Sequence, residues 1–278
     1  MKKLCLLILG VIVAIATAYA QPAVHIKKSG KGDPVIFLPG FTCPGSVWDE
    51  TIAHLDQEYE THVISYAGFN GLQPIKMPWY ETVRQEMITY INKNKLSNVR
   101  IVGHSMGGML AIDLAAELPD RVRSVIAVDA LPCLRELWMP GVPANSFRYD
   151  SPYNKQQLEA TDETMKQTAT MMASSMTLRQ DKADLISKWT LEADRETYVY
   201  GYTDILKIDL RDALKSVKAK TLILGAPYPD AKVVTATFEK QYANLQTKII
   251  EIAENSRHFI MFDQPEWFYG KVNSFFAK

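Results

Sequence analysis

The most informative stretch of this sequence is VRIVGHSMGG, at positions 99–108. Residues 99–102 are mostly apolar and β-branched, which predicts a buried strand, and residues 106–118 have the apolar spacing of a helix. A serine at such a strand–turn–helix corner is held in a strained backbone conformation, and the glycines around it avoid clashes across the tight turn. Ser105 is therefore predicted to stand above the edge of a sheet, at the N-terminus of a helix.

Short apolar runs and helical patterns alternate on both sides of this corner. The predicted strands cover residues 35–38, 62–65, 99–102, 122–128, 221–224 and 248–252, and the predicted helices cover 48–55, 80–93, 106–118, 233–242 and 266–276. Strands that alternate with helices of this length favour right-handed crossovers. The fold class is therefore α/β, with a mainly parallel central sheet flanked by helices.

Residues 131–202 interrupt the alternation. This segment is rich in proline at its start and in methionine at its middle, and it contains no convincing strand. A segment of this length is too long for a simple loop. It is predicted to form an inserted helical cap over the sheet.

The motif Gly103-His104-Ser105-Met106-Gly107-Gly108 resembles the nucleophile elbow of the α/β-hydrolase fold family. Other landmarks follow in the order of that family: residues 37–41 resemble the oxyanion loop, 221–225 the strand before the acid, and 257–259 the histidine loop. The resemblance covers nearly all of residues 24–278 apart from the cap. It implies a serine hydrolase that needs no metal and no organic cofactor.

A serine hydroxyl needs a base to become a nucleophile, and His258 is the candidate. His258 follows the last predicted strand, so its loop reaches the same sheet edge as Ser105. The family order of serine, acid and histidine leaves two candidates for the acid. Asp230 is favoured because it follows residues 221–225, although four residues separate it from Gly225 where the family commonly has two. Asp129, at the end of the preceding strand, is the competitor.

Acyl transfer also needs donors for the oxyanion that develops on the carbonyl oxygen. The resemblance assigns this role to the backbone N–H groups of Phe41 and Met106, whose side chains are candidates for the lining of an acyl pocket. The leading hypothesis is hydrolysis of a small ester, or a related acyl bond, through an acyl-enzyme on Ser105. An acyltransferase with the same triad and a catalytically silent ligand-binding homologue are the alternatives.

Composition and the N-terminus suggest a location and limit the partners. The 278 residues contain 31 basic and 31 acidic side chains without a basic run, so no nucleic-acid partner is expected. Lys2 and Lys3, an apolar run over 4–16 and the sequence Ala18-Tyr19-Ala20 are typical of a signal peptide cleaved before Gln21. The expected protein is exported, periplasmic or secreted, has no stable membrane span after cleavage and acts on a small-molecule substrate. After cleavage, residues 21–278 form one hydrolase domain with the cap, and Cys43 and Cys133 are left either bridged or free.

Overall fold

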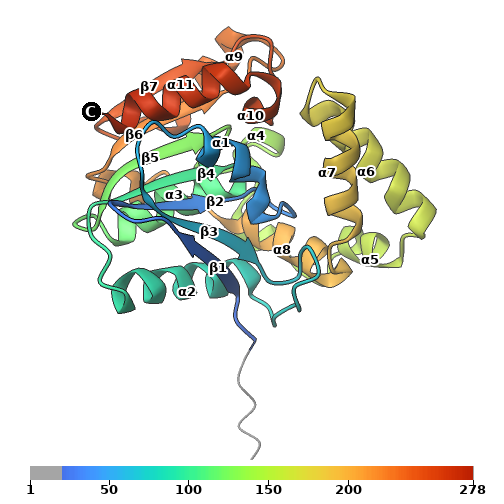
Figure 1. Ribbon diagram of the computed structural model, residues 1–278. Helices are drawn as coiled ribbons and strands as arrows, with labels where there is room; N and C mark the ends of the chain where they lie inside the picture. Colours follow the sequence, from blue (N-terminus) through green and yellow to red (C-terminus); the bar gives the residue numbers. More distant parts are fainter. Residues whose placement is uncertain (1–20, 278) are drawn as a thin grey trace, which may run out of the picture.

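A seven-stranded sheet forms the centre of the computed structural model, which describes residues 21–277 (Figure 1). The strands are ordered β1-β3-β2-β4-β5-β6-β7, and every neighbouring pair is parallel except β1 and β3. Their bounds are β1 Val24–Ser29, β2 Pro34–Leu38, β3 Glu60–Tyr66, β4 Val99–His104, β5 Val122–Val128, β6 Lys220–Gly225 and β7 Lys248–Ile252.

Six of these strands contain the six apolar runs that predicted them, and β1 is the strand that the sequence did not predict. β1 lies at the edge of the sheet and pairs antiparallel with β3, with Val24 opposite Tyr66. Most of its residues are exposed, Lys27 and Lys28 among them. Its sequence therefore lacks the apolar run of a strand that is buried on both faces.

Each face of the sheet has its own hydrophobic core because the side chains of a strand alternate between the two faces. Ile36 and Leu38 of β2 contribute to the core that packs under α2 and α3, whereas Val35 and Phe37 contribute to the core under α11. The body helices are α1 Asp49–Ala53, α2 Trp79–Lys93, α3 Met106–Glu117, α9 Ala231–Gln241, α10 Ile260–Asp263 and α11 Pro265–Phe276. The predicted helix at 48–55 is divided into a 3-10 turn, η1 Gly45–Trp48, and the short α1.

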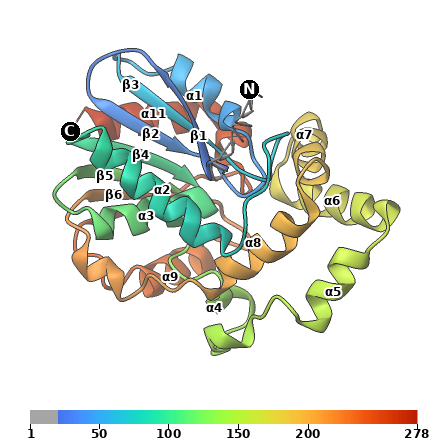
Figure 2. The same cartoon turned by 90° about the horizontal axis from the view of Figure 1, so that it is seen from below.

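The chain between β5 and β6 contains a run of helices. They are α4 Arg135–Trp138, α5 Pro152–Glu159, α6 Asp162–Met176, α7 Gln180–Leu191 and α8 Arg195–Lys207, with the 3-10 turns η2 Ala144–Ser146 and η3 Ala213–Ser216. The helices α6 and α7 pack side by side and extend beyond the sheet, whereas α8 returns to pack on α2 (Figures 1 and 2). We call residues 131–207 the cap.

The N-terminal segment predicted as a signal peptide lies outside the described residues. Within residues 21–277, no helix has both the length and the apolar character needed to cross a bilayer.

Candidate active site

Ser105 occupies the corner between β4 and α3 with φ 53° and ψ −121°. This positive φ is strained for a residue with a side chain. The corner closes only because its neighbours are glycines. A Cβ on Gly103 would lie 2.2 Å from the carbonyl oxygen of Gly107, and one on Gly107 would lie 2.3 Å from the carbonyl oxygen of Leu38. The elbow that the motif predicted is therefore present in the structure.

Backbone pairing places Ser105 beside the end of β5. The Ser105 N–H donates to the carbonyl of Val128 at 2.8 Å, and the next residue, Asp129, also has a positive φ of 46°. The Asp129 N–H donates to the carbonyl of Leu224 on β6 at 2.7 Å. Three neighbouring strand ends thus meet at one edge.

His258 lies at this edge and is hydrogen-bonded to Asp129. Its Nδ1 lies 2.6 Å from Oδ2 of Asp129, and the two side chains are only 28% and 20% exposed. The other carboxylate oxygen of Asp129 accepts the Ala226 N–H at 3.1 Å. Because a carboxylate only accepts, Nδ1 carries a proton and Nε2 is left as the basic nitrogen when the imidazole is neutral.

The preference for Asp230 as the partner of His258 is wrong in this structure. Asp230 is exposed and forms the N-cap of α9, where its Oδ1 accepts the N–H groups of Lys232 and Val233 at 2.8 and 3.0 Å. The four residues after Gly225 carry the chain past the edge, and an aspartate before a helix satisfies the first free amides of that helix. The competitor, Asp129, holds the position beside His258.

The two predicted oxyanion donors, Phe41 and Met106, flank a small apolar cavity. Within the described chain, neither backbone N–H donates to another protein group. The cavity has a volume of about 50 Å³ and includes Ser105 in its wall. The other lining residues are Phe41, Met106, Met109, Ala130, Leu131, Leu134, Tyr202 and Ile205.

Several of these cavity residues were not predicted from the sequence. Tyr202 and Ile205 lie one turn apart on α8, and Phe41 packs against the ring of Tyr202 with ring centroids 6.0 Å apart. Burial raises the pKa of Tyr202 to about 12, so its hydroxyl stays neutral. The helical spacing of Tyr202 and Ile205 was visible in the sequence, but their contact with the elbow depends on how α8 packs.

The two cysteines of the described chain are free and buried. Burial raises the pKa of the Cys43 thiol to about 12, which leaves it protonated and unreactive. Cys133 is held through its backbone, because its N–H donates to Gln241 and its carbonyl accepts from the same side chain. Of the two alternatives for Cys43 and Cys133, a disulfide or free thiols, this structure shows free thiols.

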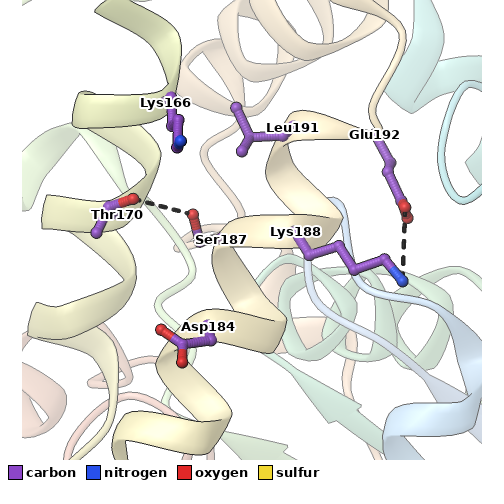
Figure 3. Close-up of a pocket in the computed structure, with 7 residues that line it drawn as sticks. All are labelled: Lys166, Thr170, Asp184, Ser187, Lys188, Leu191 and Glu192. Carbon is purple, nitrogen blue, oxygen red and sulfur yellow. Dashed lines mark hydrogen bonds and ion pairs between the residues drawn. The ribbon is translucent and has the colours of Figure 1, made fainter. Parts of the chain in front are cut away.

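A larger hollow of about 390 Å³ lies between α6 and α7 and shares no residue with the cavity at Ser105 (Figure 3). Thr170 and Ser187 point toward each other across it with their hydroxyl oxygens 3.4 Å apart, and Lys188 pairs with Glu192 at 3.7 Å. This hollow is the groove of a helical hairpin, and no histidine lines it. Among residues 21–277, no three His, Cys, Asp or Glu side chains are grouped to hold a metal ion.

The sequence matches the model of one protein family over most of its length. The model of the alpha/beta hydrolase family matches residues 35–271. The chain belongs to the α/β-hydrolase family. The strands β3 to β7, the elbow at Ser105 and the helices between β5 and β6 of this α/β hydrolase lie within the matched region, and β1 precedes it.

Similar proteins include curated relatives and solved structures. A pimeloyl-[acyl-carrier protein] methyl ester esterase of Aeromonas salmonicida is 24% identical over 91% of this chain and 99% of its own length. One of Legionella pneumophila is 27% identical over 80% of this chain and 87% of its own length. Among solved structures, an esterase from Exiguobacterium antarcticum aligns with a TM-score of 0.76 at 18% identity, over 93% of this hydrolase and 99% of that chain. An enol-lactonase from Burkholderia xenovorans aligns with a TM-score of 0.73 at 16% identity, over 92% and 96% of the two chains.

Proposed function

We propose that this α/β hydrolase cleaves small carboxylic esters through an acyl-enzyme on Ser105, with His258 as the base and Asp129 as the acid. One observation carries the proposal: the 2.6 Å hydrogen bond from His258 Nδ1 to Asp129, beside the strained elbow that presents Ser105. A histidine fixed in this tautomer has a basic Nε2 available for a neighbouring hydroxyl.

The proposed reaction has two halves. His258 takes the Ser105 proton as the hydroxyl attacks the ester carbonyl, and the N–H groups of Phe41 and Met106 stabilise the oxyanion. The tetrahedral intermediate collapses, His258 protonates the leaving alcohol, and the acyl group stays on Ser105. Water that gives a proton to His258 then attacks the acyl-enzyme. The second tetrahedral intermediate collapses, His258 returns the proton to Ser105, and the carboxylic acid product is released. Asp129 stabilises the imidazolium in both halves.

The cavity beside Ser105 indicates the size and polarity of the acyl group that the site can bind. Its volume of about 50 Å³ and its apolar lining suit a short unbranched chain without a charge. Burying each methylene of such a chain contributes about 0.8 kcal/mol, so binding improves with chain length only until the cavity is filled.

The names of the curated relatives suggest an ester bound to an acyl-carrier protein, but we favour a free small ester for this chain. The cap, residues 131–207, carries nine basic and eleven acidic side chains, so it offers no excess of positive charge to an acidic carrier. Several of the basic groups are already ion-paired, including Arg148 with Asp150 and Arg179 with Asp181.

Labelling with a fluorophosphonate tests the proposed function. We expect the wild type to be labelled at one serine, and Ser105→Ala to abolish labelling together with hydrolysis of short p-nitrophenyl esters. His258→Ala should lower both rates by about 10⁴-fold or more. An unlabelled wild type would remove the proposal. A labelled wild type that releases product only when an acceptor alcohol is added would instead make the chain an acyltransferase.

We also propose that the chain is exported, on the pattern of residues 2–20. Expression of residues 1–278 in a Gram-negative host should then yield a mature protein that begins at Gln21. An N-terminus at Met1 in the purified protein would contradict this proposal.

A further inference from the structure

His104 is buried at the end of β4, between two parts of the candidate site. It is 1% exposed, and its ring packs against the rings of His258 and Phe259, with centroids 4.6 and 4.5 Å away. Its Nε2 lies 3.0 Å from the backbone carbonyl oxygen of His258. The side chain that precedes the nucleophile thus contacts the main chain of the base.

The tautomer of His104 follows from this contact. A carbonyl oxygen only accepts, so Nε2 carries the proton and donates it to the bond. Burial lowers the pKa of His104 well below its ordinary value of 6.5, and the neighbouring His258 adds to the lowering, so the ring is neutral and Nδ1 carries no proton. Within the described residues Nδ1 has no hydrogen-bond partner.

The unprotonated side of the ring faces the oxyanion loop. A Cβ on Gly40 would lie 2.7 Å from Nδ1 of His104, so the ring packs directly on the backbone of Gly40, the residue before the proposed donor Phe41. One imidazole therefore separates Gly40 on one side from the peptide of His258 on the other.

We infer that His104 is a positioning residue that fixes the main chain of His258 relative to the oxyanion loop through its Nε2–H bond. The inference rests on the proposed function, because it gives His104 a role through the base His258. A misplacement of about 1 Å can lower a catalytic rate about 10²-fold, so a single bond to the peptide of the base has a measurable effect.

Matched variants of His104 separate the bond from the packing. In His104→Gln the side-chain amide nitrogen occupies the place of Nε2 and can still donate, whereas His104→Leu fills the space without a donor. His104→Asn puts its amide near the place of Nδ1 and cannot reach the carbonyl, so it replaces the leucine variant if that variant does not fold. His62→Gln is the control for loss of a buried histidine, because His62 lies on β3 and bonds to Tyr90 and Glu60 instead.

Two measurements test the inference. Fluorophosphonate labelling of His104→Leu should be about 10²-fold slower than that of the wild type, with His104→Gln restored to within about tenfold and His62→Gln unchanged. In proton NMR, the Nδ1–H of His258 should give a far-downfield resonance that Asp129→Asn removes. This resonance should shift or broaden in His104→Leu and persist in His104→Gln.

Labelling at the wild-type rate and an unmoved resonance in His104→Leu would overturn the inference. Equal losses in the leucine and glutamine variants would also overturn it, since packing alone would then explain them. The resonance does not depend on turnover, so it decides the role of His104 even if the wild type proves unreactive and the proposed function fails.

Discussion

At the scale of single residues, the two aspartates that competed for the role of acid make the sharpest test. Asp129→Asn keeps the shape of the side chain but can present an N–H to His258 Nδ1, which favours the wrong tautomer. We expect kcat for a short ester to fall about 10⁴-fold, the size of effect seen when a triad aspartate becomes asparagine. Steady-state kinetics on the purified variant would measure it.

Asp230→Asn is the matched control. Asparagine is as good an N-cap as aspartate, so both kcat and the free energy of unfolding should stay close to wild type. Asp230→Ala should cost about 1 kcal/mol of stability through the lost cap on α9, without loss of kcat. If Asp230→Asn abolished turnover and Asp129→Asn did not, the acid proposed here would be the wrong one.

The residues of the site were predictable to different degrees. Ser105 and His258 were found because each has a strong local signature, the glycine-rich corner and the loop after the last strand. Phe41 and Met106 followed from the family resemblance, and their side chains do line the cavity. The carboxylate partner of His258 was predicted wrongly because β5 and β6 both end at the same edge, and the sequence does not reveal which of the two loops turns toward His258.

At the scale of elements, Asp263 joins the cap to the histidine loop. Its Oδ1 accepts the hydroxyl of Thr177 at 2.6 Å and the N–H of Leu178 at 2.9 Å, and its Oδ2 accepts the N–H of Arg257 at 2.8 Å. The Phe259 N–H donates in parallel to the carbonyl of Met176, at 3.0 Å. The end of α6 is therefore bonded to the segment that carries His258.

Asp263→Ala should loosen this junction. Hydrogen bonds to a charged acceptor contribute about 1.5–3 kcal/mol each. The three bonds of Asp263 are only partly buried or exposed, and water replaces part of what they contribute. We therefore expect a net loss of about 3 kcal/mol in the free energy of unfolding, together with a lower kcat. Denaturant unfolding and ester kinetics would measure the two effects. Asp181→Ala, on an exposed ion pair of the same cap, is the control and should change little. If Asp263→Ala kept the wild-type kcat and stability, Asp263 would not be needed to hold the cap against the histidine loop.

Chain-length selection is also set by an element, because α8 supplies one wall of the cavity. Tyr202→Ala should enlarge the cavity and move the preferred p-nitrophenyl ester to longer acyl chains, with about a fourfold gain in kcat/KM for each methylene that becomes buried. Tyr153→Ala removes an exposed tyrosine of α5 that does not line the cavity, and its profile should match the wild type. Identical profiles for Tyr202→Ala and wild type would place the acyl group elsewhere.

The elements themselves were largely predictable from periodicity. Buried parallel strands and amphipathic helices have strong patterns, so β2 to β7 and most body helices were located within a few residues. β1 was missed because an exposed edge strand is defined by its backbone pairing with β3 and not by its composition. The paths of α5 to α8 depend on long-range contacts such as Asp263 with Thr177, which no local pattern encodes.

At the scale of the whole molecule, two buried histidines make folding stability depend on pH. Burial is the main cause that lowers the pKa values of His62 and His104, and the Glu60 carboxylate partly offsets it at His62. Below their ordinary pKa of 6.5, the unfolded chain binds protons that the folded chain does not. Their contribution is therefore complete above this pH and is lost as the pH falls.

We expect the free energy of unfolding to fall between pH 6.5 and 5, by at most about 1.4 kcal/mol per pH unit for each histidine. Denaturant melts across this range would show the slope, and a variant with both His62→Gln and His104→Gln should have a shallower one. A slope that is the same in both proteins would mean that other groups control the acid sensitivity.

The hydrogen bonds around Asp129 have an evolutionary consequence. Its backbone N–H donates to the carbonyl of Leu224 and its carboxylate accepts the N–H of Ala226, so the end of β6 holds a carboxylate that the end of β5 supplies. Because β5 and β6 are neighbours that end at the same edge, a carboxylate on either of the two following loops starts close to the same imidazole. A lineage could move the aspartate from one of these loops to the other through an ancestor that carried an aspartate on both, without losing activity. Matching such sequences column by column would then assign the wrong residue, whereas the partner of the imidazole identifies the right one.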